Sequence, residues 1–254
     1  IINLVKTISP DIIHIHSADY GKFSLFLRKY PIILSVWGSD VLLPKKKSLL
    51  HKIILKLVFK RADVITTIAV FMGPYIHENF NIPCDKIKRI PWGVDLSTFN
   101  RNYYIKSKKL RRELGISEDS FVLISNRNIG PLYQTEKIIE SSRLILDSHP
   151  NTYFVLLKGY GTSIYENEMK ELAKKLGVNK NMIFVSNMLT PKEMAVYLNM
   201  ANAFISIPKS DQFGLSILEG MACGLVPILS DTIISYKQYL NEENSIFVNP
   251  EDSV

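Results

Sequence analysis

Short runs rich in β-branched residues alternate with amphipathic segments along most of the chain, and this alternation narrows the possible folds more than any other feature. Strands separated by helices are typical of βαβ units and predict a mostly parallel sheet. At 254 residues the chain is long enough for two ordinary domains. The expected strands cover 11–17, 31–37, 62–69, 121–125, 152–161, 182–186, 203–207 and 226–230; the expected helices cover 45–61, 135–148, 165–176 and 191–200.

A polar segment divides the alternating strands and helices into two groups. Residues 96–120 are rich in turn-forming and charged residues and follow Pro91 and Gly93, so we expect the joint between two domains there. Residues 1–95 then form the first domain. Residues 121–254 form a second, Rossmann-like doubly wound domain with four or five parallel strands.

Composition and the two ends of the chain set the cellular context. Apolar residues make up 46% of the chain, yet no run approaches the roughly 18 apolar residues needed to span a bilayer. The first residues lack the features of a secretory signal, and the chain opens on Ile1, so we expect a segment of a longer protein. Cys84 and Cys223 have no metal-ligand or redox spacing, which favours a reducing cytoplasm.

The net charge of +7 lies entirely in the first part, where residues 1–95 hold 14 Lys and Arg against 7 Asp and Glu. Lys52, Lys56 and Lys60 repeat every four residues and form a basic stripe on the expected helix. The stripe predicts an anionic membrane surface as partner for Lys45–Arg61; alternatively, the broad apolar side of this helix faces the sheet. Basic and aromatic residues do not interleave as in a nucleic-acid-binding module.

The stretch from Ser210 to Asp231 is the most informative for function. A helix begins near Leu215, directly after an expected strand, and its first amides suit a phosphate. Glu219, one turn inside, can accept two hydrogen bonds from the vicinal hydroxyls of a ribose, and Asp211 can accept bonds from a second polyol. This arrangement predicts a nucleotide-sugar site. The alternative is a helix with an Asp near its N-cap and a surface Glu.

The same stretch resembles the signature of glycosyltransferase family 4, a retaining family. In that signature a Glu-Gly-Phe-Gly-Leu run precedes a Leu-Glu-Ala-Met-Ala-Cys-Gly run, and here Phe213-Gly214-Leu215, Leu218-Glu219 and 221–224 match in register. Segments 10–17, 35–42, 62–69, 90–100, 123–133 and 156–161 resemble further family motifs.

The resemblance implies an α/β protein of the GT-B class, with two Rossmann-like doubly wound domains facing a cleft and the N-terminal one partial. It implies a nucleoside-diphosphate-sugar donor, no metal and no further cofactor. Glu219 then binds the nucleotide ribose, Asp211 the donor sugar and Arg127 the leaving diphosphate. The remaining residues implied on the nucleotide-sugar side are Phe213, Gly214, Leu215, Ser216 and Gly159.

Three positions depart from the family pattern. Trp37 stands where many members have a His near the reacting sugar, which leaves a packing role or stacking on the donor. Leu132 replaces a Lys that is expected five residues after Arg127; Lys158 is a candidate substitute, against the alternative of a solvated lysine at a strand end. Asp211 is one methylene shorter than the Glu it replaces.

On the acceptor side the candidates are His16, Trp37 and Asp40, with a turn-capping role as the rival interpretation for Asp40. His14 and His16 share one strand face, but no third ligand accompanies them, so a metal pair is disfavoured.

The sequence thus predicts a metal-independent glycosyltransferase that moves a sugar to a glycan or lipid-linked glycan with retention, in cell-envelope polysaccharide or glycolipid synthesis. We expect it in the cytoplasm or peripherally on the inner face of the cell membrane. Two alternatives remain: a nucleotide-sugar epimerase on the same fold, and a degenerate subunit that binds a nucleotide-sugar or a partner transferase without turnover.

Overall fold

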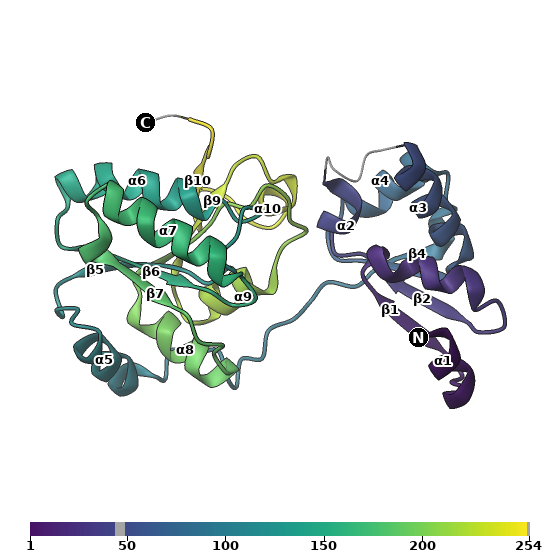
Figure 1. Ribbon diagram of the computed structural model, residues 1–254, viewed down its shortest axis with the longest axis horizontal. Coiled ribbons are helices and arrows are strands. Elements are labelled where there is room, and N and C mark those ends of the chain that lie inside the picture. Colours follow the sequence, from purple (N-terminus) through teal and green to yellow (C-terminus); the bar gives the residue numbers. More distant parts are fainter. Residues whose placement is uncertain (44–48, 253–254) are drawn as a thin grey trace. The chain divides into compact units, whose positions relative to one another are not determined.

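The computed structural model describes residues 1–43 and 49–252. The chain divides into two compact units (Figure 1). The first unit comprises Ile1–Trp92 together with Ser210–Phe213, and the second comprises Gly93–Lys209 and Gly214–Val254. The four residues Ser210–Phe213, which lie within the nucleotide-sugar motif, therefore pack with the first unit although they are far from it in sequence.

The first unit contains a sheet of four parallel strands in the order β1-β2-β3-β4. Their register places Ile13 opposite Ile32 and Ile33 opposite Val64. Parallel strands need crossover connections, and the segments between these strands supply them. The strands are β1 (Ile13–His16), β2 (Ile32–Ser35), β3 (Val64–Thr67) and β4 (Ile87–Arg89).

Helices cover one face of this sheet. Leu55, Val58 and Phe59 of α3 are at most 2% exposed and pack in one core cluster with Leu34 and Ile65 of the sheet. Their spacing of three and four residues defines the inner face of α3. The helices of this unit are α1 (Ile2–Ile8), η1 (Ala18–Phe26), α2 (Ser39–Leu42), α3 (Leu49–Arg61), α4 (Met72–Phe80) and η3 (Cys84–Lys86).

The second unit contains a sheet of six parallel strands in the order β10-β9-β8-β5-β6-β7. The strand order reverses at the neighbours β5 and β8, because the chain runs outward from β5 to β7 and then returns to β8 on the other side. This is the doubly wound arrangement. The strands are β5 (Phe121–Ser125), β6 (Thr152–Leu157), β7 (Met182–Val185), β8 (Ala203–Ser206), β9 (Val226–Ser230) and β10 (Ile246–Val248).

Figure 1 shows α6 and α7 on one side of this sheet and α5 and α8 on the other. The start of α8 is fixed by a capping box, in which Thr190 and Glu193 each satisfy the other's backbone amide. The helices of this unit are α5 (Tyr104–Glu113), α6 (Thr135–Ser148), α7 (Ser163–Lys175), η4 (Asn179–Asn181), α8 (Pro191–Met200), α9 (Leu215–Ala222) and α10 (Ile234–Lys237).

The parallel α/β architecture with two Rossmann-like sheets is confirmed. One expectation needs correction: the second sheet has six strands where four or five were expected, because the three-residue strand β10 is too short to show alternation. The segment 96–120, where we expect the joint, contains helix α5 and lies in the second unit, which begins at Gly93. The helix expected over 45–61 is observed as α3 from Leu49 onward. Residues 45–48 lie outside the described part of the chain.

We predict that Gly220→Ala lowers the free energy of unfolding by about 1–3 kcal/mol, the usual cost of overpacking. A Cβ at Gly220 would lie 2.6 Å from the ring of Phe204, so this glycine lets α9 approach β8. Urea unfolding checks the prediction. Gly93→Ala is the control, since a Cβ there meets nothing within 4 Å; equal midpoints for the two variants would contradict this packing.

Candidate functional site

The switch point of the second sheet places two loops side by side. One loop follows β5 and carries Arg127; the other follows β8 and leads into α9. In doubly wound sheets ligands bind beyond the carboxyl ends of the strands at this point. The fold therefore puts the start of α9 where a ligand of the second unit is expected.

Hydrogen bonds fix the first turn of α9 against the loop after β5. Asn126 donates through Nδ2 to the backbone oxygen of Ser216 at 2.7 Å, and Arg127 donates through Nη1 to Ser216 Oγ at 2.8 Å. Gly214 is the N-cap residue and no side chain caps this helix. The positive end of the helix dipole and the Arg127 guanidinium thus lie together, which is the arrangement that binds phosphate.

The ring of Tyr133 packs against the guanidinium of Arg127. The Arg127 guanidinium lies 4.7 Å from the centre of that ring, within the range of a cation–π interaction. Sequence reasoning did not single out Tyr133; the signal was its place directly after Leu132, where the family's lysine is missing. Leu132 accepts a hydrogen bond from the backbone of Lys209 at 2.8 Å and so joins the two loops.

Glu219 lies one turn further into α9 and is partly buried. Burial raises the pKa of its carboxyl above the ordinary value, and the nearby positive charge of Arg127 acts in the opposite direction. A carboxylate that is short of water and lies near a cation is a strong hydrogen-bond acceptor. Glu219 therefore has the setting expected of a group that binds hydroxyls.

The turn after β6 depends on Gly159. Its φ is +53°, and a Cβ there would lie 1.9 Å from Asn128 Oδ1. The same oxygen accepts a hydrogen bond from the backbone of Tyr160 at 3.1 Å. The left-handed φ favours glycine at this position, and a side chain there would force Asn128 Oδ1 to move.

Lys158 is engaged within the second unit. Its Nζ lies 3.4 Å from Glu166 Oε2 and donates to Ser163 Oγ at 2.8 Å, and its side chain is 18% exposed. Burial acts to raise the pKa of Glu166, but hydrogen bonds from Lys170 and Ser186 outweigh it, and the pKa lies below its ordinary value. Lys158 thus has an anionic partner and is mostly shielded from solvent. Its role toward a diphosphate stays a prediction.

The motif residues Asp211 to Phe213 belong to the first unit, where Gln212 anchors them. Gln212 is 1% exposed; its Nε2 donates to the oxygen of Val36 at 3.0 Å, and its Oε1 accepts from the amides of Ile68 and Ala69 at 3.2 and 3.3 Å. Sequence reasoning missed this residue, which stands where the family pattern has a glycine. No signal in the sequence could have indicated its partners, since they lie more than 140 residues away.

The backbone around Gln212 is strained. Phe213 has a φ of +91°, which is rare for a residue with a side chain, and it is 8% exposed. Asp211 is partly exposed and accepts a hydrogen bond from the amide of Gln212 at 2.8 Å. Gly38 is needed opposite, because a Cβ there would lie 2.9 Å from Gln212 Cγ. Strain of this kind is characteristic of functional loops.

Asp40, an expected acceptor-side residue, is buried. Its carboxylate accepts hydrogen bonds from the amides of Ala18 at 2.6 Å and Trp37 at 3.0 Å, and burial raises its pKa. This placement fits the turn-capping interpretation, since the carboxylate fixes the loops after β1 and β2. Its role toward an acceptor stays a prediction.

His16 and Trp37 lie together at the carboxyl edge of the first sheet. Their ring centres are 6.4 Å apart, and Trp37 also makes an edge-to-face contact with Trp92 at 5.5 Å. Trp37 is 47% exposed, so it is not a core packing residue. His14 lies 4.0 Å from His16, ring to ring, and shares a hydrogen bond of 2.8 Å with Ser35.

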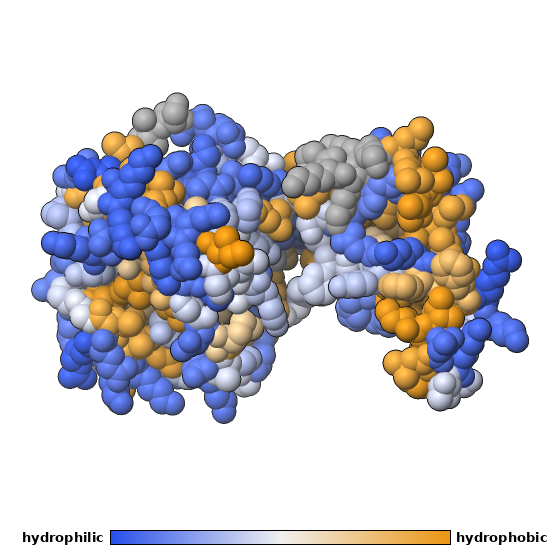
Figure 2. Space-filling model, in the orientation of Figure 1, coloured by the Kyte–Doolittle hydropathy of each residue, from blue (hydrophilic) through white to orange (hydrophobic). Residues whose placement is uncertain are grey.

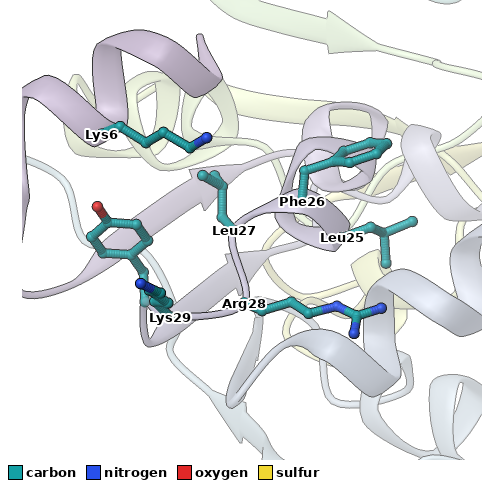
Figure 3. Close-up of a pocket in the computed structure, with 7 residues that line it drawn as sticks. Lys6, Leu25, Phe26, Leu27, Arg28 and Lys29 are labelled. Atoms are coloured by element: carbon teal, nitrogen blue, oxygen red, sulfur yellow. The ribbon is translucent and has the colours of Figure 1, made fainter.

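A separate hollow of about 760 Å³ lies in the first unit between α1 and the end of η1 (Figure 3). None of the predicted site residues lines it, and its charged lining residues are all cations. It is lined by Lys6, Leu25, Phe26, Leu27, Arg28, Lys29 and Tyr30.

Residues 1–43 and 49–252 contain no helix with the length and apolar character required to cross a bilayer. Among the same residues, no three His, Cys, Asp or Glu side chains are grouped closely enough to hold a metal ion.

Comparison with known families identifies the class of protein. Residues 106–254 match the family described as glycosyl transferases group 1, and residues 1–69 match glycosyl transferase 4-like proteins. The first match covers more than half of the chain. The chain therefore belongs to glycosyl transferases group 1.

Individual relatives agree with this membership. The chain is 30% identical over 143 residues to an alpha-monoglucosyldiacylglycerol synthase of Streptococcus pneumoniae. This alignment covers 56% of this chain and 31% of the relative. It is 23% identical over 222 residues to the N-acetyl-alpha-D-glucosaminyl L-malate synthase of Bacillus anthracis, covering 85% and 55% respectively. The chain thus spans about a third to a half of the length of these relatives.

Solved structures confirm the GT-B fold. The crystal structure of Anabaena HepE in complex with UDP and glucose superposes with a TM-score of 0.82 at 17% identity, covering 98% of this chain and 67% of that one. Sucrose-phosphate synthase from Thermosynechococcus elongatus gives a TM-score of 0.81 at 18% identity, covering 98% and 63%.

We predict that Gln212→Ala lowers the free energy of unfolding by about 1–3 kcal/mol, because it leaves buried backbone groups without their partner. Urea unfolding followed by circular dichroism measures the change. The control is Gln238→Ala, at an exposed position, which should stay within about 0.5 kcal/mol of the parent. A Gln212 variant as stable as this control would show that the hydrogen bonds contribute nothing.

Proposed function

We propose that the protein transfers a sugar from a nucleoside-diphosphate-sugar to a hydroxyl group of a glycan or a lipid-linked glycan. The bond between the anomeric carbon and the β-phosphate oxygen breaks, and a bond forms between that carbon and the acceptor oxygen. The acceptor proton passes to the departing phosphate oxygen, so the products are the glycoside and the nucleoside diphosphate. Cell-envelope polysaccharide or glycolipid synthesis is the setting we propose.

The observation that carries the proposal is the joint placement of Arg127, Ser216 and Glu219 at the switch point of the second sheet. Arg127 and the amides at the start of α9 face the charge that develops on the leaving diphosphate. Positive groups that are already in position lower the barrier because they need no reorganisation. Glu219 accepts the ribose hydroxyls, and no metal enters the proposal.

The remaining assignments follow the family pattern. Asp211 binds hydroxyls of the donor sugar, and the anomeric configuration is retained. The proposal names no protein base, because the departing phosphate oxygen accepts the proton. The Anabaena HepE structure was solved with UDP and glucose, which supports a nucleotide-sugar as the class of donor.

One observation favours a second candidate, a subunit that binds a nucleotide-sugar without turnover. Lys158, the candidate replacement for the missing lysine, is held by Glu166. Release of nucleoside diphosphate that depends on an acceptor separates the two candidates, since a binding subunit releases none. The same measurement separates the transferase from an epimerase.

Nucleotide binding gives the first test of the proposal. In a thermal-shift panel of UDP, GDP and ADP and their sugars, one nucleotide should raise the melting temperature of the full chain. A ligand at about 100 times its Kd stabilises by about 2.7 kcal/mol. Glu219→Ala and Arg127→Ala should each abolish most of the rise, while Glu251→Ala, on the exposed surface, should keep it. No rise with any nucleotide would refute the proposal.

The raised pKa of Glu219 gives a second prediction. The ionised carboxylate accepts the ribose hydroxyls, so nucleotide affinity should fall as the pH drops through this pKa. Titration calorimetry between about pH 5 and pH 8 measures the dependence. Glu219→Gln cannot ionise and should bind weakly with a flatter pH profile. An unchanged profile in Glu219→Gln would exclude this carboxyl as the titrating group.

We also propose an anionic membrane surface as a partner of the first unit, at the cytoplasmic face. Helix α3 buries one side in the core, yet its outer side keeps Leu49, Leu50, Ile53 and Leu57 between 48% and 76% exposed. Figure 2 shows apolar side chains gathered over α3. Lys52, Lys56 and Lys60 are exposed along the flank of this apolar face, a pattern typical of helices that lie in the membrane interface.

Vesicle sedimentation tests this partner. The full chain should bind vesicles of phosphatidylglycerol and phosphatidylcholine and dissociate as salt is raised. Reversing Lys52, Lys56 and Lys60 to Glu should abolish binding. The matched control reverses Lys174, Lys180 and Lys192, which are exposed on the second unit and give the same change in net charge. Equal binding by the two triple variants would exclude α3 as the docking surface.

A further inference from the structure

Two hydrogen bonds anchor the loop on either side of Tyr133. Leu132, the residue before it, accepts from the backbone amide of Lys209 at 2.8 Å. Gln134, the residue after it, donates through Nε2 to the backbone oxygen of Ile207 at 2.7 Å. Both partners follow β8 directly, so the backbone of Tyr133 is tied to the loop that leads into α9.

The turn that carries Tyr133 has a constrained backbone. Gln134 has a φ of +53°, in the left-handed region that residues with a side chain seldom occupy, and it is 4% exposed. The amide of Tyr133 donates to the backbone oxygen of Gly130 at 3.0 Å. A strained backbone persists only where the surrounding contacts hold it. The ring of Tyr133 therefore starts from a backbone with little freedom.

This ring is one of the groups that hold Arg127. The guanidinium lies 4.7 Å from the centre of the Tyr133 ring, and its Nη1 donates to Ser216 Oγ at 2.8 Å. An arginine side chain has many rotamers, and ordering it on ligand binding costs free energy unless the protein has fixed it beforehand. Contacts from the loop after β5 and from α9 do this before any ligand arrives.

The fixed orientation of Arg127 matters because this chain has lost a cation. Leu132 and Tyr133 stand where the family pattern has Lys-Gly. Lys158 lies 3.4 Å from Glu166 Oε2, so part of its charge is already neutralised. A diphosphate at the start of α9 would depend strongly on Arg127, and hence on how well the guanidinium is oriented.

We propose that Tyr133 is a positioning residue of the donor site, whose ring holds the guanidinium of Arg127 in the orientation that binds the diphosphate. A guanidinium stacks well on an aromatic ring, which fixes its plane as well as its place. The ring thereby compensates for the lysine that is missing at Leu132. This inference rests on the proposed nucleotide-sugar site, for which it names the residue that governs diphosphate recognition.

Two other roles of Tyr133 make different predictions. If the hydroxyl group bound phosphate directly, Tyr133→Phe would be as harmful as Tyr133→Leu. If the ring merely filled space, its removal would have the same effect with and without the guanidinium of Arg127. The positioning role requires the opposite result in both comparisons.

Titration calorimetry of the full chain with UDP, GDP and ADP makes the first comparison. For the nucleotide that binds the parent, Tyr133→Leu and Tyr133→Met should each raise the Kd by about 5- to 20-fold, while Tyr133→Phe should stay within about twofold. Two ringless variants keep the test valid should one of them fail to fold. A parent-like Kd in the ringless variants, or an equal loss in Tyr133→Phe, would overturn the proposal.

The matched control removes another ring of the same kind. Tyr104 on α5 is 63% exposed and lies under the ammonium of Lys108, which is 4.9 Å from its ring centre. Tyr104→Leu therefore removes a cation–π contact away from the site, and it should leave the nucleotide Kd unchanged. A loss equal to that of Tyr133→Leu would show that the effect is not specific to Arg127 and would overturn the proposal.

A double-mutant cycle makes the second comparison. In an Arg127→Ala background, Tyr133→Leu should change the nucleotide Kd by less than about twofold, because the ring has lost the group it acts through. The weak binding of this background is measured from the melting temperature at up to about 20 mM nucleotide. The same fold loss in both backgrounds would overturn the proposal.

The outcomes separate this inference from the proposed function. If one nucleotide binds the parent and the ringless variants alike, the positioning role of Tyr133 is refuted and the donor site stands. If none of the three nucleotides binds the parent, the donor site is refuted, and the role of Tyr133 is refuted with it.

Discussion

The hydrogen bonds from Asn126 and Arg127 to Ser216 are the interaction on which the candidate donor site depends. They join the loop after β5 to the first turn of α9 and so bring a cation to the positive end of a helix. The backbone hydrogen bond from Lys209 to Leu132 also joins the two loops, but it does not reach the first turn of α9. The position of Glu219 follows from the same contact, because it lies on the helix that these hydrogen bonds orient.

Close packing of backbone supports this arrangement. Gly220 lets α9 approach β8, and Gly159 lets the turn after β6 approach Asn128. A side chain at Gly220 would clash with the ring of Phe204, and one at Gly159 would displace the side chain of Asn128. In the first unit, Gly38 likewise leaves room for the side chain of the buried Gln212. Positioning in this protein thus rests on small residues and on polar contacts to backbone rather than on large side chains.

The sequence predicted the parallel α/β architecture and most strands, because β-branched runs and helical periodicity are local signals. It predicted that Arg127 and Glu219 belong together only through the family motif, and the structure places both at one switch point. Gln212 and the partners of Lys158 were beyond prediction, since each depends on residues that meet only after folding. The one sequence signal for Tyr133 was its place directly after Leu132. Asp40 was assigned to the acceptor side from its motif; its burial gives it two backbone amides as partners.

The central claim is that Glu219 recognises the ribose of a nucleoside diphosphate, and removing the hydroxyls from the ligand tests it most directly. The nucleotide that stabilises the protein should bind more tightly than its 2′,3′-dideoxy counterpart by about 10- to 100-fold, as expected for hydrogen bonds to a charged group. In Glu219→Ala the two ligands should bind equally. The same preference for the ribose form in both proteins would contradict the claim.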